Sequence, residues 1–339
     1  MLKVSVLTQN NNLQDDFSEN LRDYLDIERI NSQDCQKRTV KLLNQAYTQV
    51  YGENTLKILV SYIKPANLFK TDILTPIQLG RAVEKENSKD GVQSDENLKW
   101  LHENCMFHDD FEGGISKYNR QIGFLTGTYW AWKNYDQLGC PKYFGSFGYR
   151  KLLYPEFLDD LTKYDCVFPR KVDLGKTSKE IFIGAHGSKA YDKTMEILQK
   201  LYPDDALNFE KYMGLKEGYL LEMYVMKKEI FFDFCKWIFP IVFALLDLAD
   251  DALMPDNKEE IVRFFETEDI SKDCTADNFE IYQKRIRAFM IERLTGYYLY
   301  KLTQNGVKYV EQDYCPVEHI DTIDPIIRLL RLEKERSNV

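Results

Sequence analysis

Three side chains suited to binding a diphosphate follow a short apolar segment near the middle of the chain. Tyr149, Arg150 and Lys151 come after residues 143–147, which we expect to form a strand. Arginine carries a permanent, forked positive charge and lysine a point charge, and both bind phosphate oxygens. Such cations stabilise a negative leaving group when a bond between a sugar and a phosphate breaks. The residue types alone fit equally well a basic turn in which Arg150 forms a surface ion pair.

Two adjacent carboxylates, Asp109 and Asp110, precede the glycine pair Gly113 and Gly114. They could hold a divalent cation on a diphosphate, or one of them could take a proton from a sugar hydroxyl. An acidic turn closed by the glycines explains the same residues. The Asp-x-Asp motif, with which many nucleotide-sugar enzymes hold a metal ion, is absent from the sequence.

Two aromatic segments are further candidates for a binding site. Residues 57–63 are apolar and β-branched, which predicts a buried strand that ends in Tyr62 and is followed by Lys64. A tyrosine can stack on a base while a lysine attracts a phosphate, although an ordinary strand exit with a surface lysine fits as well. Trp130 and Trp132 lie two residues apart on an expected helix and point to different faces. We expect one of them in the core and the other at a cleft, with a simple packing helix as the alternative.

Short apolar segments alternate with helical patterns along the chain. This alternation indicates an α/β fold, in which ligands bind at the carboxyl ends of the strands. Strands are expected at residues 3–7, 57–63, 143–147, 166–169, 180–183 and 219–226. Helices are expected at residues 13–25, 34–51, 71–84, 124–135, 191–202, 228–248, 282–301 and 324–336, with Pro76 tolerated in the first turn of the third. A further helix is expected within residues 151–164, beginning near Pro155.

Composition excludes several classes of protein. The 339 residues carry 45 Lys and Arg against 54 Asp and Glu, so the net charge of −9 argues against general nucleic-acid binding. No P-loop, GxGxxG or GxSxG motif is present. Seven scattered cysteines and the lack of a secretory signal favour reduced thiols in the cytoplasm. The longest apolar run, residues 237–246, is too short to cross a membrane and predicts a core helix.

Taken in order, six parts of the chain resemble a bacterial family found in gene clusters for capsular polysaccharide and lipopolysaccharide. They are KILVSYIKP with TDILTPIQLG, DDFEGGIS, LTGTYWAWKN, FGSFGYRKLL, MKKEIF with CKWIFPI, and Arg285 with Glu292-Arg293-Leu294. Members of this family, long catalogued only as a domain of unknown function, are treated as glycosyltransferases of the GT-A type. The chain departs from the family pattern at Ile63, Phe124, Gly148, Lys151 and Glu222.

The resemblance implies a GT-A-like nucleotide-sugar-binding domain, with a central mixed sheet flanked by helices, a helical N-terminal extension and a helical C-terminal part. We expect the extension at residues 1–54, the glycosyltransferase domain at 55–302 and a C-terminal tail with a short helix at 303–339. The location it implies is the cytoplasm, with peripheral attachment to the inner face of the cytoplasmic membrane as an option.

The implied reaction moves a hexose, galactofuranose or heptose from a UDP- or GDP-linked donor to a growing capsular polysaccharide or lipopolysaccharide. The partners are thus the nucleotide-sugar and a lipid-linked or polysaccharide acceptor. No tightly bound cofactor is expected, and Mg or Mn is compatible with the site but on balance not required. A non-catalytic carbohydrate-binding or scaffold protein of a polysaccharide assembly complex is the alternative.

With this reaction in view, we expect roles for single residues, among them Glu222 although it departs from the family pattern. Glu222 is the expected general base, Asp110 a contact to a metal ion or to the acceptor, and Arg150 the stabiliser of the leaving diphosphate. A metal ion, if one binds, would contact Asp109 and Asp110. The residues expected to bind the nucleotide-sugar are Tyr62, Lys64, Pro76, Gln78, Gly80, Trp130, Asn134, Tyr149 and Lys151.

Overall fold

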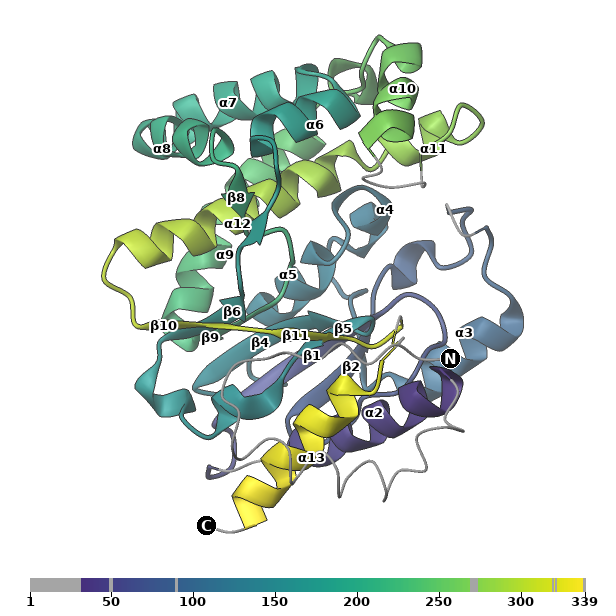
Figure 1. The fold of residues 1–339 in the computed structure, drawn as a ribbon. Helices are drawn as coiled ribbons and strands as arrows, with labels where there is room; N and C mark the ends of the chain where they lie inside the picture. The colour runs from purple at the N-terminus through teal and green to yellow at the C-terminus, as the bar shows by residue number, and fades with distance from the viewer. Residues whose placement is uncertain are drawn as a thin grey trace.

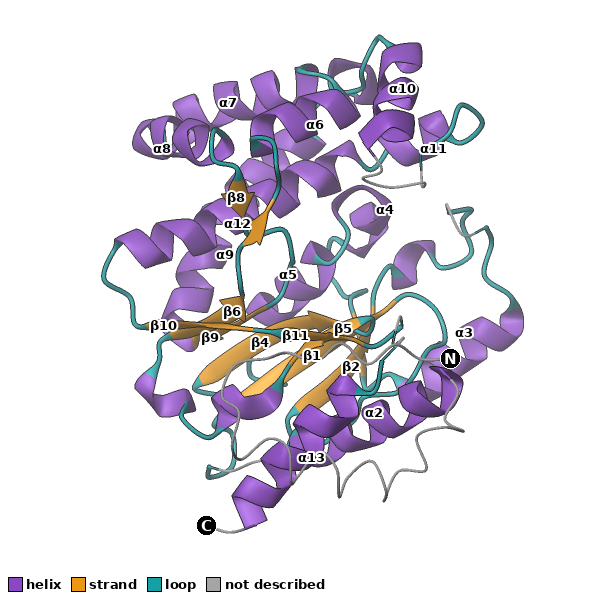
Figure 2. Ribbon diagram, viewed as in Figure 1, coloured by secondary structure: helices purple, strands orange, loops and turns teal. Residues whose placement is uncertain are grey.

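A mixed sheet forms the centre of the molecule (Figures 1 and 2). The computed structural model describes residues 32–48, 51–88, 91–268, 274–318, 320 and 322–337, so the expectations for residues 3–7 and 13–25 lie outside the described residues. The main path of the sheet runs in the order β10-β6-β9-β4-β1-β2-β3, and β5 and β11 join it beside β4. Its strands are β1 (Leu56–Tyr62), β2 (Leu74–Gln78), β3 (Phe107–His108), β4 (Tyr143–Gly148), β5 (Lys151–Leu153), β6 (Cys166–Pro169), β9 (Tyr224–Lys227), β10 (Tyr309–Gln312) and β11 (Tyr314–Pro316). A separate short pair consists of β7 (Val172–Asp173) and β8 (Glu217–Gly218).

The strand directions bring several chain segments to one edge of the sheet. Strand β1 runs parallel to β2 and β4, and β2 runs parallel to β3, so the carboxyl ends of these four strands share an edge. Strand β9 runs antiparallel to β4, with Tyr224 opposite Ser146, which brings the start of β9 to the same edge. Residues that follow β1, β2 and β4 therefore meet residues that precede β9.

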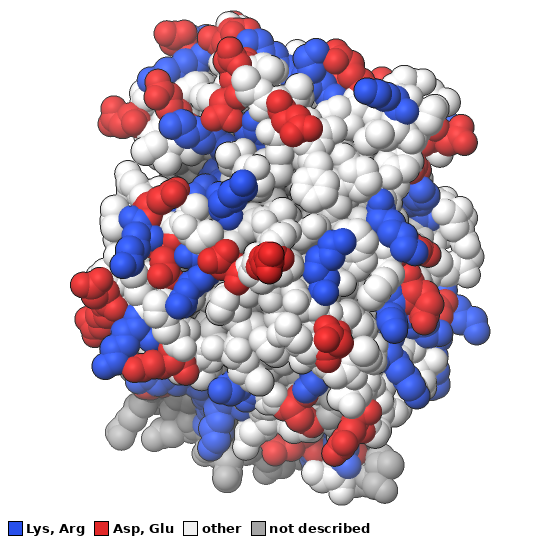
Figure 3. All heavy atoms as spheres, turned by 180° about the vertical axis from the view of Figure 1, so that it is seen from behind, with Lys and Arg blue, Asp and Glu red and all other residues white. Residues whose placement is uncertain are grey.

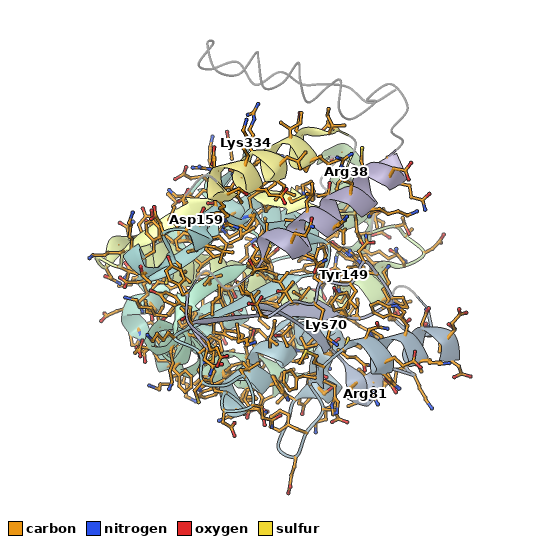
Figure 4. All side chains as sticks on the ribbon, turned by 90° about the horizontal axis from the view of Figure 1, so that it is seen from below. Arg38, Lys70, Arg81, Tyr149, Asp159 and Lys334 are labelled. Carbon is orange, nitrogen blue, oxygen red and sulfur yellow. The ribbon has the colours of Figure 1, made fainter. Side chains whose placement is uncertain are left out.

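Helices cover both faces of the sheet, and a further layer of helices lies above it (Figure 1). Helices α2 and α13 pack side by side on one face (Figure 4), and α5 and α9 pack on the other. The upper layer consists of α6–α8 and α10–α12. The α-helices are α2 (Ser32–Ala46), α3 (Asp95–Asn104), α4 (Asn119–Ile122), α5 (Leu125–Lys133), α6 (Ser178–His186), α7 (Lys189–Leu201), α8 (Pro203–Met213), α9 (Lys228–Leu246), α10 (Lys258–Glu268), α11 (Phe279–Gln283), α12 (Ile286–Gln304) and α13 (Asp324–Ser337).

The alternation of strand side chains divides the interior into two large cores. Ile58 and Val60 of β1 pack with α2 and α13, while Leu59 between them packs with α5 and α9. Helix α2 lies inside the expected extension, yet its neighbour Tyr47 is fully buried in the first of these cores. The Tyr47 hydroxyl also donates a hydrogen bond to the carbonyl oxygen of Leu153 at 2.6 Å. The domain boundary at residue 54 stays a prediction, but α2 shares its core with the sheet.

Residues 71–84 form strand β2 and a 3-10 helix at Arg81–Val83, so the helix expected there is wrong. The carbonyl oxygen of Pro76 accepts a hydrogen bond from the backbone nitrogen of Met106 at 2.9 Å. The proline nitrogen faces the same side of the strand, where β3 is too short to require a donor from it. A proline is therefore tolerated inside this strand.

The strand expected at residues 180–183 is also wrong, because these residues lie in α6. Thr177 and Glu180 form a capping box: the Thr177 hydroxyl accepts a hydrogen bond from the Glu180 nitrogen, and the Glu180 carboxylate accepts one from the Thr177 nitrogen. This local capping outweighs the β-branched composition of the segment. Residues 155–158 and 161–163 of another expected helix form short 3-10 helices instead.

Helix α9, which holds the longest apolar run, is a core helix as predicted, with Phe234, Ile238 and Val242 fully buried. In the described part of the chain, no helix is long and apolar enough to cross a membrane. On the face shown in Figure 3, basic and acidic side chains are interspersed around uncharged areas.

Candidate active site

A cavity of about 550 Å³ lies at the carboxyl edge of the sheet. Its floor comes from the ends of β1 and β4 and from the segment before β9, and one wall comes from helix α12 and the residues just before it. The cavity thus lies between the sheet and the upper layer of helices. Its position agrees with the edge at which an α/β fold binds its ligands.

Cations dominate the charged side chains of this cavity. Among the described residues, five cationic side chains line it against two carboxylates, Glu222 and Glu292. The cations are Arg120, Arg150, Lys151, Lys284 and Arg285. An excess of positive charge in a partly enclosed site attracts an anion such as a diphosphate.

Arg150 and Tyr149 form a connected pair at the end of β4. The Arg150 Nε and Nη2 atoms donate to the Tyr149 hydroxyl at 3.3 Å, and Nε lies 3.2 Å from a carboxylate oxygen of Glu318. The Arg150 side chain is 42% exposed, so its guanidinium remains accessible from the cavity. Lys151, the next residue, also lines the cavity and lies over the Tyr314 ring. Tyr149, Arg150 and Lys151 thus lie together where β4 turns into β5, and the ion pair of Arg150 is also what the alternative, a basic turn, predicts. Their role toward a diphosphate stays a prediction.

The two carboxylates of the cavity form an electrostatically coupled pair. Burial and the negative charge of Glu292 raise the pKa of Glu222 well above its ordinary value, and Arg285 and Arg293 oppose this shift. Burial also raises the pKa of Glu292, against the effect of Arg293, whose Nη1 donates to Glu292 Oε2 at 2.5 Å. A carboxyl group with a raised pKa exchanges a proton near neutral pH more readily than an exposed one. The pair can therefore serve as a proton acceptor and donor in the cavity.

Asp109 and Asp110 lie apart from this pair. Asp109 is buried, and its carboxylate accepts hydrogen bonds from the backbone nitrogens of Gly80 (2.7 Å) and Arg81 (3.1 Å) and from the Ser116 hydroxyl (2.5 Å). It fixes the turn after β2. Asp110 is exposed and does not line the cavity. No group of three or more His, Cys, Asp or Glu side chains within the described residues is arranged to hold a metal ion, and the metal assignment to these two residues stays a prediction.

The residues expected to hold the nucleotide along β1 and β2 support the cavity without lining it. The Tyr62 ring is fully buried and stacks on Tyr149 at 5.3 Å. Gln78 is buried and bonds to Arg81 and Glu84, each at 2.7 Å. Gly80 has a φ of +68°, and a side chain there would collide with Asn119, which does line the cavity. Pro76 lies inside β2 and Lys64 in the loop after β1, and neither lines the cavity.

Helix α5 places its aromatic residues away from the cavity. Trp130 is buried and packs on Phe107 with ring centroids 4.5 Å apart, as expected for the core member of the pair. Asn134 ends the helix and donates to the Trp130 carbonyl oxygen at 3.0 Å. Trp132 stacks on Phe239. None of these three side chains lines the cavity.

Sequence reasoning missed the contribution of α12. Arg285, Phe289 and Glu292 lie three or four residues apart and line the cavity from one face of this helix. Arg285 and Glu292 were part of the family resemblance, but nothing in their spacing indicated that α12 lies opposite the end of β4. The 3.6-residue period of the charged positions was the signal that could have marked this face.

The chain is similar to one protein family and to one solved structure. A family model described as "Domain of unknown function (DUF4422)" matches residues 57–268. A solved structure titled "WbbM bifunctional glycosytransferase apo structure" is similar in fold, with a TM-score of 0.57 and 22% sequence identity over 78% of this chain and 46% of that one. This chain therefore spans less than half of that protein's length. None of the curated proteins compared with the chain matches it. The likeness of fold confirms the expected class, a GT-A-like domain with a central mixed sheet flanked by helices.

Proposed function

The chain belongs to the family of the domain of unknown function DUF4422, and from this premise we propose that it is a glycosyltransferase. It moves a hexose, galactofuranose or heptose from a UDP- or GDP-linked donor to a growing capsular polysaccharide or lipopolysaccharide. The likeness of its fold to a bifunctional glycosyltransferase supports the reaction class. The reaction takes place in the cytoplasm, where activated sugars are made, with a lipid-linked acceptor at the inner face of the membrane.

One observation carries the proposal: a single cavity joins a cluster of cations to a pair of carboxylates with raised pKa values. Arg150 and Lys151 line it at the end of β4, and Glu222 lies before β9, next to that strand end. Glycosyl transfer from a diphosphate needs positive charge at the leaving group and a proton acceptor near the sugar. The cavity offers both along the edge of one sheet.

The proposed reaction follows from the positions of these cations and carboxylates in the cavity. The bond between the anomeric carbon and the diphosphate oxygen breaks, and its electron pair stays on the diphosphate, where Arg150, Lys151 and Arg285 stabilise it. The acceptor hydroxyl oxygen bonds to the anomeric carbon, and its proton passes to the Glu222 carboxylate. The raised pKa makes Glu222 a stronger base than an exposed glutamate, and Glu292 contributes to this shift. Because protein cations stabilise the leaving group, we propose that turnover does not require Mg²⁺ or Mn²⁺.

Nucleotide binding is the test that separates this proposal from a carbohydrate-binding scaffold. UDP, GDP and CMP are added to the full chain, and thermal unfolding is followed. A nucleotide at 100 times its Kd stabilises the folded state by about 2.7 kcal/mol, so the Tm rises. Hydrolysis of nucleotide-sugars without acceptor, across a donor panel, then identifies the donor. If no nucleotide raises the Tm and no donor is hydrolysed, the scaffold function replaces the glycosyltransferase.

A further inference from the structure

A second cavity of about 410 Å³ shares Tyr149 with the cavity described above. We propose that this second cavity binds a neutral saccharide. Its wall comes from Gln36 of α2, the loop at residues 65–67 after β1, Trp100 of α3, Tyr149 and Glu318. Figure 4, which views the molecule from below, places Tyr149 in the interior near α2. The volume falls within the ~300–1,000 Å³ common for small-molecule sites.

The aromatic part of this wall is held in place before any ligand binds. The Tyr62 ring packs against both Trp100 (5.7 Å, tilted) and Tyr149 (5.3 Å, stacked). Two hydrogen bonds fix Tyr62: its hydroxyl donates to the Asn67 carbonyl oxygen and accepts from the Phe69 nitrogen, each at 2.9 Å. Trp100 is partly exposed. Preorganised aromatic surfaces of this kind pack against the C–H groups of a sugar ring at little entropic cost.

Polar groups with unused hydrogen-bonding capacity complete the wall. Gln36 Nε2 donates to the Val317 carbonyl oxygen at 2.9 Å, which fixes the amide, while its side-chain oxygen accepts nothing from the described residues. The side-chain amide of Asn67 likewise has no hydrogen-bond partner in the described part of the chain. Glu318 adds a carboxylate acceptor. Amide and carboxylate groups match the vicinal hydroxyls of a saccharide, each of which both donates and accepts.

The charge of the wall distinguishes this site from the first. No lysine or arginine lines the second cavity among the described residues, whereas five cations line the first. The one carboxylate among its described lining residues, Glu318, is paired with Arg150 at 3.2 Å. A phosphate therefore finds no cation in the described part of this wall, whereas a neutral polyol needs none.

The two sites are linked through Arg150. This residue lines the first cavity and forms an ion pair with Glu318, which lines the second. A saccharide bound beside Tyr149 therefore lies next to the proposed diphosphate site. Its assignment as part of the glycan acceptor rests on the proposed function, whereas saccharide binding itself does not.

Saturation-transfer NMR on the full chain tests the site with methyl glycosides of glucose, galactose, mannose and N-acetylglucosamine as probes. At least one probe is expected to bind, and Trp100→Ala and Asn67→Ala are each expected to weaken its binding at least tenfold. Asn67→Ala guards against a folding defect in Trp100→Ala. The atom of Asn67 that bonds to Tyr62 is the backbone oxygen, which this substitution keeps. Trp132→Ala, a change of another partly buried tryptophan that lines neither cavity, is the matched control.

Titration of UDP against the same samples separates the possible outcomes. UDP is expected to bind both variants as it binds the unchanged protein. The proposal is overturned if no probe binds, if neither variant weakens binding, or if UDP displaces the bound glycoside. Loss of UDP binding in Asn67→Ala would assign the cavity to the nucleotide and also overturn it. Saccharide binding without nucleotide binding would instead refute the proposed function and leave the saccharide site standing.

Discussion

Arg150 lines the first cavity and forms an ion pair with Glu318, which lines the second. Its guanidinium contacts the Tyr149 hydroxyl and the Glu318 carboxylate while remaining 42% exposed. We predict that Arg150→Ala lowers the affinity for UDP or GDP roughly tenfold to a hundredfold, because a charge-assisted hydrogen bond contributes ~1.5–3 kcal/mol. Isothermal titration calorimetry measures the change.

Arg170→Ala is the matched control for this substitution. Arg170 is 62% exposed, pairs with Asp313 at 2.7 Å and does not line the cavity. It should bind nucleotide as the unchanged protein does. Equal affinity in a folded Arg150→Ala variant would remove Arg150 from the diphosphate site.

Glu222 makes a second prediction, about the pH dependence of activity. Because burial and Glu292 raise its pKa, the carboxylate form is lost at a higher pH than for an exposed glutamate. Activity should therefore fall on acidification before ordinary carboxylates are protonated. Glu222→Gln should lower kcat by about 10²–10⁴-fold, the usual contribution of a general base. A pH–rate profile with an unshifted acid limb would contradict the role.

The same raised pKa predicts how stability depends on pH. The folded state binds this proton more tightly than the unfolded chain, so the contribution of Glu222 is fully present at low pH and is lost as pH rises through its raised pKa. Glutamine does not titrate, so Glu222→Gln removes this loss of stability at high pH. We expect its Tm, relative to the unchanged protein, to be higher at pH 8 than at pH 4, as measured by scanning calorimetry. A difference independent of pH would show that Glu222 titrates normally.

At the scale of elements, the position of α12 depends on Gly296. A Cβ atom there would lie 2.2 Å from the Tyr219 carbonyl oxygen and 2.6 Å from the Tyr212 hydroxyl. Alanine is the better helix former, yet we predict that Gly296→Ala destabilises the protein by about 1–3 kcal/mol through overpacking. It should also lower activity, since α12 carries Glu292. Urea unfolding and turnover test both effects.

Gly52→Ala provides the comparison, since a Cβ atom at Gly52 has no neighbour within 4 Å. Its free energy of unfolding should change by no more than about 0.5 kcal/mol. If Gly296→Ala proves as stable as the unchanged protein, α12 is not held by this close approach.

The elements also show how far sequence patterns lead. Strand β1 and helix α9 could be predicted because each is buried in the core and therefore shows a continuous run of apolar residues in the sequence. Strand β2 could not, since Pro76 is tolerated only because β3 is short, which is a property of another segment. In α6, the capping box of Thr177 and Glu180 stabilises a helix, although the β-branched composition of the segment favours a strand. Composition alone therefore fails where a neighbouring strand, as at Pro76, or a helix cap, as at Thr177, decides the conformation.

At the scale of the whole molecule, the candidate site combines parts that lie far apart in the chain. Arg150 could be proposed from a local motif and Glu222 from its departure from the family pattern, whereas Arg285 and Glu292 reach them only through the packing of α12 above the sheet. Conversely, Trp130 and Asn134 carry a suggestive motif, but Trp130 packs inside α5, Asn134 caps its end, and neither lines the cavity. Residue type indicates chemistry, and tertiary packing decides which groups share a cavity.

The charge of the whole cavity gives the last prediction, that turnover continues after chelation with EDTA. Five cations line the cavity among the described residues, and they supply the positive charge that a metal ion would otherwise bring to the diphosphate. Turnover is measured before and after chelation, and again with added Mg²⁺ or Mn²⁺. Complete loss with full rescue would contradict this and would make Asp109→Asn and Asp110→Asn the next variants to measure.

The family match ends at residue 268, before α12 begins, and this position has a consequence for exchange between relatives. Arg150, Lys151 and Glu222 precede the junction, and Arg285 and Glu292 follow it. A chimera joined there would keep the sheet side of the cavity from one parent and take its opposite wall from the other. Because strands β10 and β11 also follow the junction and pair with β6 and β5, such a hybrid exchanges part of the sheet together with the helix-side wall.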